Sequence, residues 1–133
     1  MTSVSELNKR KVQLFVEAVW NQGRLELIDE LVAADYLGHV SFLHAAVVGP
    51  EGVRRLVSSR RHAYPDLHIK LEEQLAEDDL VATRWRATAS TPETRAATRC
   101  LRCWPGISVI RLLAGKQVDT YTAVARSAPE DVA

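Results

Sequence analysis

Hydrophobic residues in the first part of the chain recur at the spacing of an α-helix. The apolar positions fall three or four residues apart, which predicts an amphipathic helix. These positions are Val12, Phe15, Val16, Val19 and Trp20. Ser3 and Glu6 have the S-x-x-E spacing of a capping box, so we expect the helix to begin there. The polar stretch 21–23 ends it, and residues 25–33 predict a second, shorter helix.

The middle of the chain passes from a stretch without a clear period to a third helix. Residues 35–48 lack a clean period, and we expect an irregular crossing with one short strand there. Gly49 and Pro50 begin the next apolar pattern, and proline suits the first helical turn because an N–H there would be unpaired. We predict a helix that ends at Pro65 and has one face formed by Val53, Leu56, Val57, Arg60 and Tyr64.

From Leu67 onward the apolar residues alternate with polar ones, which is the period of a half-buried strand. Turns are predicted at 77–79 and 114–116, and the segment 90–95 is predicted to be a loop. The predicted strands cover about residues 67–76, 81–89, 97–112 and 117–125. We expect a bulge or bend at Pro105-Gly106. The tail, about 127–133, is predicted to be frayed.

Helices at one end of a chain and strands at the other predict an α+β domain. We expect residues 1–133 to form one domain, in which three N-terminal helices cover a curved, mostly antiparallel sheet. A sheet curved by a bulge makes a cone, and the mouth of the cone can be a pocket. A chain of this length buries roughly two thirds of its unfolded surface, enough for a core without a disulfide or a metal.

The charge balance and the apolar runs exclude several classes of partner. The chain has 17 Lys+Arg and 17 Asp+Glu, so it has no basic excess with which to bind nucleic acid. No apolar run approaches the roughly 18 residues of a membrane helix. The first residues lack the apolar core of a secretory signal. We therefore expect a cytoplasmic protein without a membrane partner.

The two cysteines do not indicate a disulfide or a metal site. Cys100 and Cys103 are three residues apart on a predicted strand, so they point to opposite faces, which disfavours a bridge. No second cysteine pair and no histidine spacing complete a zinc site. The sequence also lacks the phosphate-loop, zinc-protease and serine-hydrolase motifs. We expect neither a metal nor another cofactor.

Three stretches of the chain resemble, in order, the SnoaL-like polyketide cyclase family of the nuclear transport factor 2-like superfamily. They are residues 15–39, 49–90 and 106–121, the last reading GISVIRLLAGKQVDTY. The resemblance implies a helix-covered curved sheet, a deep apolar pocket and a homodimer packed through the sheets. It also implies ring closure without cofactor or metal, by acid–base catalysis on a polyketide intermediate, although a fold alone does not fix the reaction.

The chain departs from the family at the positions that carry its chemistry. The last strand of the family commonly reads G-K-x-x-x-x-[WR]-D, and with Gly115 setting the register, Thr122 stands where the acid–base aspartate is expected. Ser108 replaces a pocket histidine of some cyclases, and Thr91 replaces the histidine of the G-T-H segment. A threonine hydroxyl cannot accept a proton near neutral pH without a neighbouring base. The usual cyclase machinery is therefore absent.

The candidate catalytic residues lie in the stretch without a clear period. His39 matches the Y-x-x-H segment of the family and His44 follows it, and a neutral imidazole there could accept or donate a proton. Both could instead be solvated loop side chains. Asp35 could orient His39, or simply be a polar residue at the helix end. Asp119 faces away from the pocket if Thr122 faces into it, unless a bulge reverses this.

The candidate substrate-binding residues are aromatic or carry a hydroxyl. Tryptophan rings can stack on a conjugated ligand and hydroxyls can donate to a carbonyl, while core packing is the other interpretation. These residues are Trp20, Tyr36, Tyr64, Trp85, Trp104, Ser108 and Thr122. Strand arginines form a solvated face or dimer ion pairs, or one of them holds a substrate carboxylate or enolate. They are Arg84, Arg86, Arg99, Arg102 and Arg111.

The sequence thus predicts a cofactor-free cyclase or isomerase of specialised metabolism, for example in antibiotic biosynthesis. It would act by acid–base catalysis on a small, apolar, carbonyl-containing, polyketide-like molecule. A non-catalytic small-molecule-binding protein of the same fold is the alternative, and Thr122 favours it. A hydrolase or epoxide opener is the third possibility, and that chemistry needs an inward pair of carboxylates. Turnover separates an enzyme from a binding protein.

Overall fold

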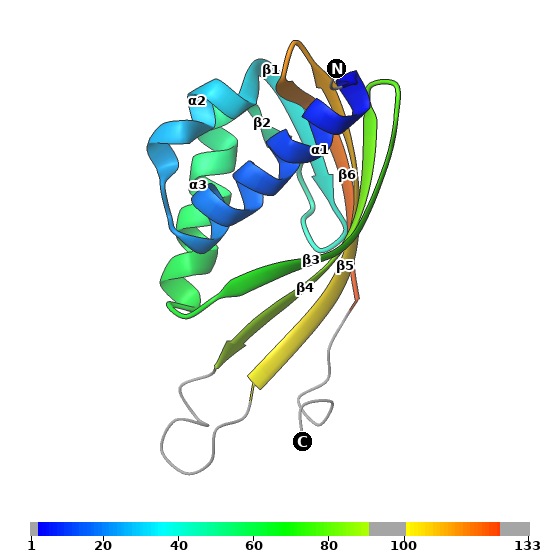
Figure 1. Cartoon of the computed structure of the whole chain (residues 1–133). Helices are drawn as coiled ribbons and strands as arrows, with labels where there is room; N and C mark the ends of the chain where they lie inside the picture. The colour runs from blue at the N-terminus through cyan, green and yellow to red at the C-terminus, as the bar shows by residue number, and fades with distance from the viewer. Residues whose placement is uncertain (1–2, 91–100, 126–133) are drawn as a thin grey trace.

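The computed structural model describes residues 3–90 and 101–125, and in it helices cover one face of a strongly curved sheet (Figure 1). The helices are α1 (Val4–Leu14), the π-helix η1 (Phe15–Asn21), the 3-10 helix η2 (Leu25–Leu27), α2 (Ile28–Leu31) and α3 (Gly49–Ala63). The strands are β1 (Val32–Val40), β2 (Val47–Val48), β3 (His68–Glu77), β4 (Leu80–Ser90), β5 (Leu101–Leu113) and β6 (Lys116–Val124). The predicted α+β class is confirmed.

The helix starts follow the sequence signals. The hydroxyl of Ser3 accepts a hydrogen bond of 3.1 Å from the backbone N–H of Glu6, so the predicted cap is present. Pro50 lies in the first turn of α3, as expected. The second helix is shorter than predicted, because the chain has already entered β1 at Val32.

The expectation of an irregular crossing with one short strand over residues 35–48 is wrong for its first part, although residues 41–46 are irregular and β2 is a short strand. Residues 35–40 belong to β1, which pairs in parallel with β6 and antiparallel with the short strand β2 at residues 47–48. The local sequence has no clean period, but pairing with a distant strand satisfies the backbone hydrogen bonds. As a consequence side chains alternate: Tyr36 and Gly38 are buried, whereas Asp35, Leu37 and His39 are exposed.

The described strands form one sheet of order β2-β1-β6-β5-β4-β3, in which the pair of β1 and β6 is parallel. The predicted meander from β3 to β6 is confirmed. The turn between β3 and β4 has Asp78 at a positive φ of 54°, and the last turn has Ala114 and Gly115 at 52° and 79°. Left-handed conformations of this kind make tight turns between antiparallel strands.

The bulge expected at Pro105-Gly106 is not found there. Pairing with β4 runs without interruption through both residues, and Gly106 lies opposite Trp85. A Cβ at Gly106 would collide with the indole of Trp85, so glycine is needed for packing and not for a bulge. Register shifts lie elsewhere in the sheet, and the one between β5 and β6 has Arg111 paired with Asp119 and Leu112 with Gln117.

The buried apolar side chains form three clusters along the concave face of the sheet. The largest joins the helices to β1 and contains Val19, Ile28, Leu31, Val32, Tyr36, Val47, Val53 and Val57. A second cluster packs α1 on the sheet and contains Val12, Val81, Ile110 and Leu112. The third is centred on Leu67, Ala87 and Ala89, with partly buried aromatic rings around it.

Several predictions concern residues outside the described part of the chain. These are the loop at 90–95 beyond residue 90, the residue Thr91, the first residues of the third strand, Arg99, Cys100 and the tail at 127–133. Within residues 3–90 and 101–125, none of the helices is long and apolar enough to cross a membrane.

Candidate functional site

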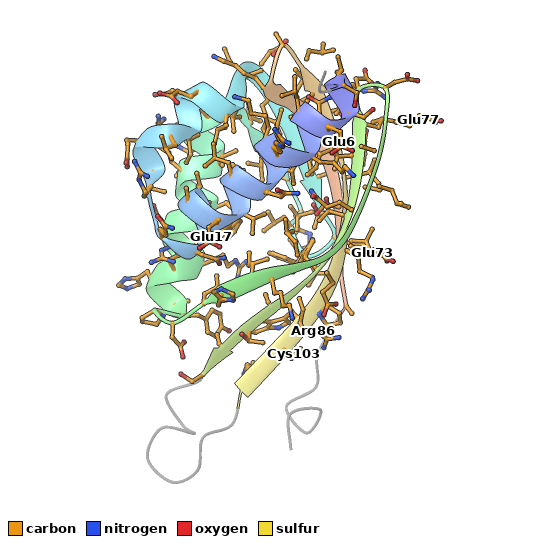
Figure 2. All side chains as sticks on the ribbon, viewed as in Figure 1. Glu6, Glu17, Glu73, Glu77, Arg86 and Cys103 are labelled. Atoms are coloured by element: carbon orange, nitrogen blue, oxygen red, sulfur yellow. The ribbon has the colours of Figure 1, made fainter. Side chains whose placement is uncertain are left out.

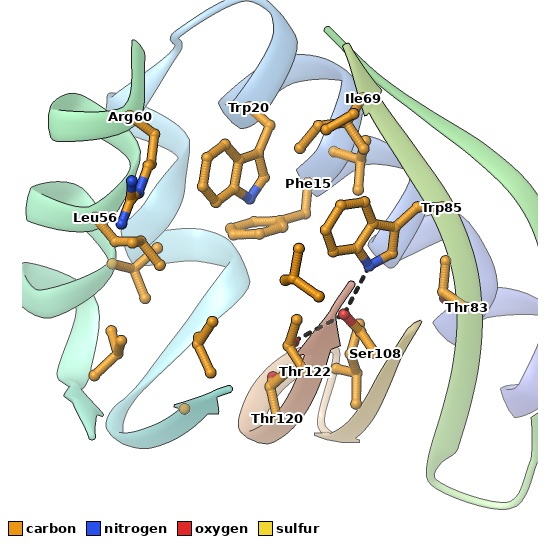
Figure 3. Close-up of a pocket in the computed structure, with 18 of the residues that line it drawn as sticks. Phe15, Trp20, Leu56, Arg60, Ile69, Thr83, Trp85, Ser108, Thr120 and Thr122 are labelled. Carbon is orange, nitrogen blue, oxygen red and sulfur yellow. Dashed lines mark hydrogen bonds between the residues drawn. The ribbon is translucent and has the colours of Figure 1, made fainter. Parts of the chain in front are cut away.

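A pocket of about 510 Å³ lies between the helices and the concave face of the sheet (Figure 3). This volume is in the range of small-molecule sites. The described residues that line it are mostly apolar, and none of them is an aspartate or a glutamate. All seven predicted substrate-binding residues contribute to the lining: Trp20, Tyr36, Tyr64, Trp85, Trp104, Ser108 and Thr122. Their roles in binding remain predictions.

Aromatic rings form the wide part of the pocket. Phe15 and Trp20, five residues apart, both line it, because they begin and nearly end the π-helical segment η1. Such segments are rare and are frequently found at functional sites. On the sheet side, Trp104 packs edge-on against Tyr64, with ring centroids 5.1 Å apart. These rings offer flat apolar surfaces to a conjugated ligand.

A chain of hydrogen bonds joins Trp85, Ser108 and Thr122 on three neighbouring strands (Figure 3). The indole N–H of Trp85 donates to Oγ of Ser108 at 3.0 Å, and the two hydroxyl oxygens of Ser108 and Thr122 are 2.8 Å apart. The two residues, which we call the hydroxyl pair, are direct partners in the register of β5 and β6. One of their two hydroxyl hydrogens joins the pair, which leaves the other for a ligand oxygen.

Three further polar side chains line the pocket without a hydrogen-bond partner. Oγ1 of Thr83, Nε2 of Gln117 and Oγ1 of Thr120 are buried and unpaired in the described structure. Gln117 and Thr120 both face inward because the register shift leaves Val118 without a partner on β5. Buried polar groups normally have partners, and the hydroxyl of Thr120 lies near that of Tyr36, so we expect Thr83 and Gln117 to be the candidates for polar contacts with a ligand. The sequence interpretation missed Gln117 because strand alternation alone does not reveal a bulge, whereas alternation with Thr122 could have indicated Thr120.

Tyr36 adds a proton donor to the pocket. Its side chain is 7% exposed. Burial raises the pKa of its hydroxyl above 10, and the carboxylate of Asp119 adds to this effect, while the nearby hydroxyl of Thr120 acts in the opposite direction. Tyr36 is therefore neutral at physiological pH and can donate a hydrogen bond, but it is not a base.

The structure does not bring the three predicted catalytic residues together in the pocket. Asp35 and His39 lie on the outward side of β1, and the ring of His39 stacks on Tyr121 with centroids 4.7 Å apart. His39 contributes to the pocket edge, but its side chain is exposed. His44 is exposed and does not line the pocket. The cause is the strand β1, whose alternation sends odd-numbered residues away from the hydroxyl pair.

Asp119 faces away from the pocket, as predicted. Its carboxylate lies 3.5 Å from Nε of Arg111, and it does not line the pocket. The bulge occurs one residue before Asp119 and changes the direction of Gln117 instead. Arg84 and Arg86 pair with Glu72 on β3, and Arg111 also pairs with Asp79 in the turn between β3 and β4.

The outer face of the sheet carries ion pairs and a free thiol. Figure 2 shows Glu73, Arg86 and Cys103 on the sheet, away from the helices. The guanidinium of Arg86 donates to Sγ of Cys103 at 3.1 Å. Cys103 is a free cysteine. In the described part of the chain, no group of three His, Cys, Asp or Glu residues is placed to hold a metal ion.

Arg60 is a pocket residue that the sequence interpretation did not single out as functional. It lies on α3, lines the pocket, and places its guanidinium carbon 4.5 Å from the centroid of the Phe42 ring. A signal was present in the sequence, because a charged residue occupies the apolar face of the helix one turn before Tyr64.

Comparison with known proteins gives a family model and a set of solved structures. The model, described as a SnoaL-like domain, matches residues 12–120. A candidate polyketide cyclase from Acidithiobacillus ferrooxidans has a TM-score of 0.79 at 21% identity, over 94% of this chain and 92% of that one. IdmH, a candidate polyketide cyclase from Streptomyces antibioticus, has a TM-score of 0.76 at 22% identity, over 88% and 91%.

A further solved structure carries the name of the fold. An NTF2-like protein of unknown function from Mesorhizobium loti has a TM-score of 0.72 at 19% identity, over 95% of this chain and 97% of that one. No curated protein sequence matches the chain. At these identities the structural likenesses establish the nuclear transport factor 2-like fold, and the reaction must be argued from the pocket.

Proposed function

The chain belongs to the SnoaL-like domain family, and from this premise we propose that it is a cofactor-free cyclase or isomerase. Its substrate would be an apolar, carbonyl-bearing, polyketide-like molecule of specialised metabolism. The observation that carries the proposal is the hydroxyl pair of Ser108 and Thr122, which has one hydrogen to donate inside a pocket walled by aromatic rings.

The pocket can promote ring closure in two ways. Its aromatic walls, which include Trp20 and Trp104, hold the flexible substrate in a folded conformation. Such positioning can supply a large part of the reduction in the activation barrier of ring closure. The hydroxyl pair then donates a hydrogen bond to the carbonyl that is attacked. A donor aimed at developing negative charge in a water-poor site typically contributes about 10²–10³ in rate.

The proposed step needs no carboxylate in the pocket. The enol carbon of the substrate attacks a carbonyl carbon of the same molecule, a carbon–carbon bond forms, and the C=O π bond breaks to give an alkoxide. The enol O–H proton moves to that alkoxide, so the product is an isomer of the substrate. Ser108 and Thr122 can relay this proton, since one hydroxyl accepts while the other donates. His39 has no part in this step, because its exposed ring stacks on Tyr121 at the pocket edge, on the outward side of β1.

A second candidate function is binding of the same class of molecule without turnover. The observation that favours it is the absence of aspartate and glutamate from the described pocket lining, with Thr122 on the last strand. The same observation disfavours a hydrolase or epoxide opener, because that chemistry needs two carboxylate side chains of the protein directed into the pocket. Binding and catalysis are separated by looking for a product.

The experiment compares Thr122→Val with His39→Ala. Polyketide-derived β-diketones are incubated with each protein, and a product of unchanged mass but altered retention is followed by chromatography and mass spectrometry. We expect wild-type turnover, a loss of about a hundredfold in Thr122→Val, and a change of less than about threefold in His39→Ala. Ligand binding without product in the wild type would favour the binding protein. A hundredfold loss in His39→Ala would make His39 the base and contradict the proposed step.

We also propose that two copies pair through the outer face of the sheet. Exposed apolar side chains lie there on β5 and β6, namely Ile107, Val109 and Tyr121, which are 53%, 38% and 60% exposed. An exposed apolar patch of this kind is typical of an interaction surface. Pairing through this face would leave the pocket, on the opposite side of the sheet, open to ligands.

A further inference from the structure

Arg60 is the charged side chain of an otherwise apolar wall. It lies on α3, is half-buried, and contributes to the pocket lining. Figure 3 shows it across the pocket from Ser108 and Thr122. A guanidinium does not lose its proton in proteins, so this wall carries a positive charge at every physiological pH.

Among the residues that the structure describes, none provides a counter-charge for Arg60. Arg24, Arg54, Arg84, Arg86 and Arg111 have carboxylate partners, whereas Arg60, which lines the pocket, does not. In the part of the chain that the structure describes, Arg60 makes no ion pair, and its Nε is buried without a hydrogen-bond partner. Leaving a buried donor of a charged group unpaired is unfavourable. An anionic ligand in the pocket would remove this penalty.

The geometry of Arg60 also restricts the shape of the anion. Its central guanidinium carbon lies 4.5 Å from the centroid of the Phe42 ring, which is a cation–π contact. A guanidinium is a planar group with pairs of parallel N–H donors, and this arrangement matches the two oxygens of a carboxylate.

We propose that the pocket takes an apolar ligand that bears a carboxylate, with the carboxylate paired to Arg60 and a carbonyl placed at the hydroxyl pair. This inference rests on the proposed function only in taking the pocket as the ligand site. It makes the substrate a polyketide-like acid and not a neutral ketone, ester or lactone. It also fixes the direction of the ligand, acid toward α3 and reacting carbonyl toward β5 and β6.

The test uses two probes with the same apolar body and different charge. They are 2-naphthoate and its neutral isostere 2-acetonaphthone, and their binding is followed by quenching of the pocket tryptophans Trp20, Trp85 and Trp104. Wild type is compared with Arg60→Gln and Arg60→Lys. The matched control is Arg55→Gln, which removes the same charge from an exposed position of α3. Thermal melts verify that each variant is folded, and Arg60→Lys provides a second variant if Arg60→Gln is not.

We expect wild type to bind 2-naphthoate at least about tenfold more tightly than 2-acetonaphthone, since a hydrogen bond to a charged group is worth this much. Arg60→Gln should lose the preference with little change for the ketone, Arg60→Lys should keep part of it, and Arg55→Gln should keep all of it. Equal affinities in wild type, or equal losses of both probes in Arg60→Gln, would overturn the inference. A retained preference without any turnover of β-diketones would support this inference while contradicting the proposed catalysis.

Discussion

Tyr36 is buried on β1 with its hydroxyl in the pocket, and its environment favours the neutral form. Burial is the main cause of its raised pKa, and the carboxylate of Asp119 adds to it. The pocket thus combines a neutral phenol, two hydroxyls in contact and one guanidinium, and its described lining has no carboxylate. Such a set can donate hydrogen bonds and stabilise negative charge, but it cannot remove a weakly acidic proton. This composition is the reason for proposing a reaction of an enol.

The raised pKa of Tyr36 predicts a specific loss of stability at high pH. The native state keeps the phenol proton to higher pH than the unfolded chain, whose tyrosines titrate near pH 10. The contribution of Tyr36 to the free energy of unfolding is therefore complete below about pH 10. Above that pH it falls, by at most about 1.4 kcal/mol per pH unit.

The measurement is urea unfolding of wild type and Tyr36→Phe between pH 7 and 11. We expect the difference in free energy of unfolding between the two proteins to be constant up to about pH 10 and then to shift in favour of Tyr36→Phe. A difference that stays constant to pH 11 would show that the pKa of Tyr36 is not raised in the folded state.

At the scale of secondary structure, the segments with a strong local period were predictable and those set by long-range pairing were not. The helix α3 (Gly49–Ala63) and the strands of the meander follow from apolar spacing, because one face of each is buried. β1 escaped prediction, because its partner β6 lies about 80 residues later in the chain. The same difference holds for the candidate site. Its aromatic and hydroxyl residues lie in the pocket as expected, but His39 points outward because β1 is a strand, and the local sequence did not indicate this.

A substitution of Gly106 tests how closely Trp85 of β4 packs on β5 in the pocket wall. Gly106 lies opposite Trp85, and any Cβ there would collide with the indole. Gly106→Ala should therefore lower the free energy of unfolding by about 1–3 kcal/mol, the usual cost of overpacking. It should also disturb the bond from Trp85 to Ser108.

A double-mutant cycle with Trp85→Phe provides the control. The colliding atoms belong to the six-membered ring of the indole, and phenylalanine is smaller. We expect Gly106→Ala to cost less in the Trp85→Phe background than in wild type, with the two substitutions not additive. An equal cost in both backgrounds would mean that Gly106 is required for the backbone and not for the tryptophan.

At the scale of the whole molecule, the sheet separates two faces with different roles. The concave face, covered by helices, holds the pocket, while the convex face carries ion pairs and exposed apolar residues. The family model covers residues 12–120, so both faces belong to the shared domain. Inside the pocket, we expect Thr122 and Arg60 to determine what can bind and react.

Association through the convex face predicts an effect of one charge placed at its centre. Val109→Lys puts an ammonium among Ile107 and Tyr121, and a buried unpaired charge strongly disfavours an interface. We expect wild type to be a dimer and Val109→Lys a monomer in light scattering after size exclusion, with ligand binding in the pocket retained. The control is Leu7→Lys on α1, an exposed position in the helical layer on the other side of the sheet. A dimer that survives Val109→Lys would place the interface elsewhere.

The central claim is that the hydroxyl pair binds the carbonyl of an apolar ligand, and a crystal structure of the protein with 2-acetonaphthone tests it most directly. We predict that the naphthalene lies against Trp20 and Trp104 and that the ketone oxygen lies within about 2.5–3.0 Å of the hydroxyl of Ser108 or Thr122. A ketone oxygen held by other groups, or a ligand bound outside the pocket, would contradict the account.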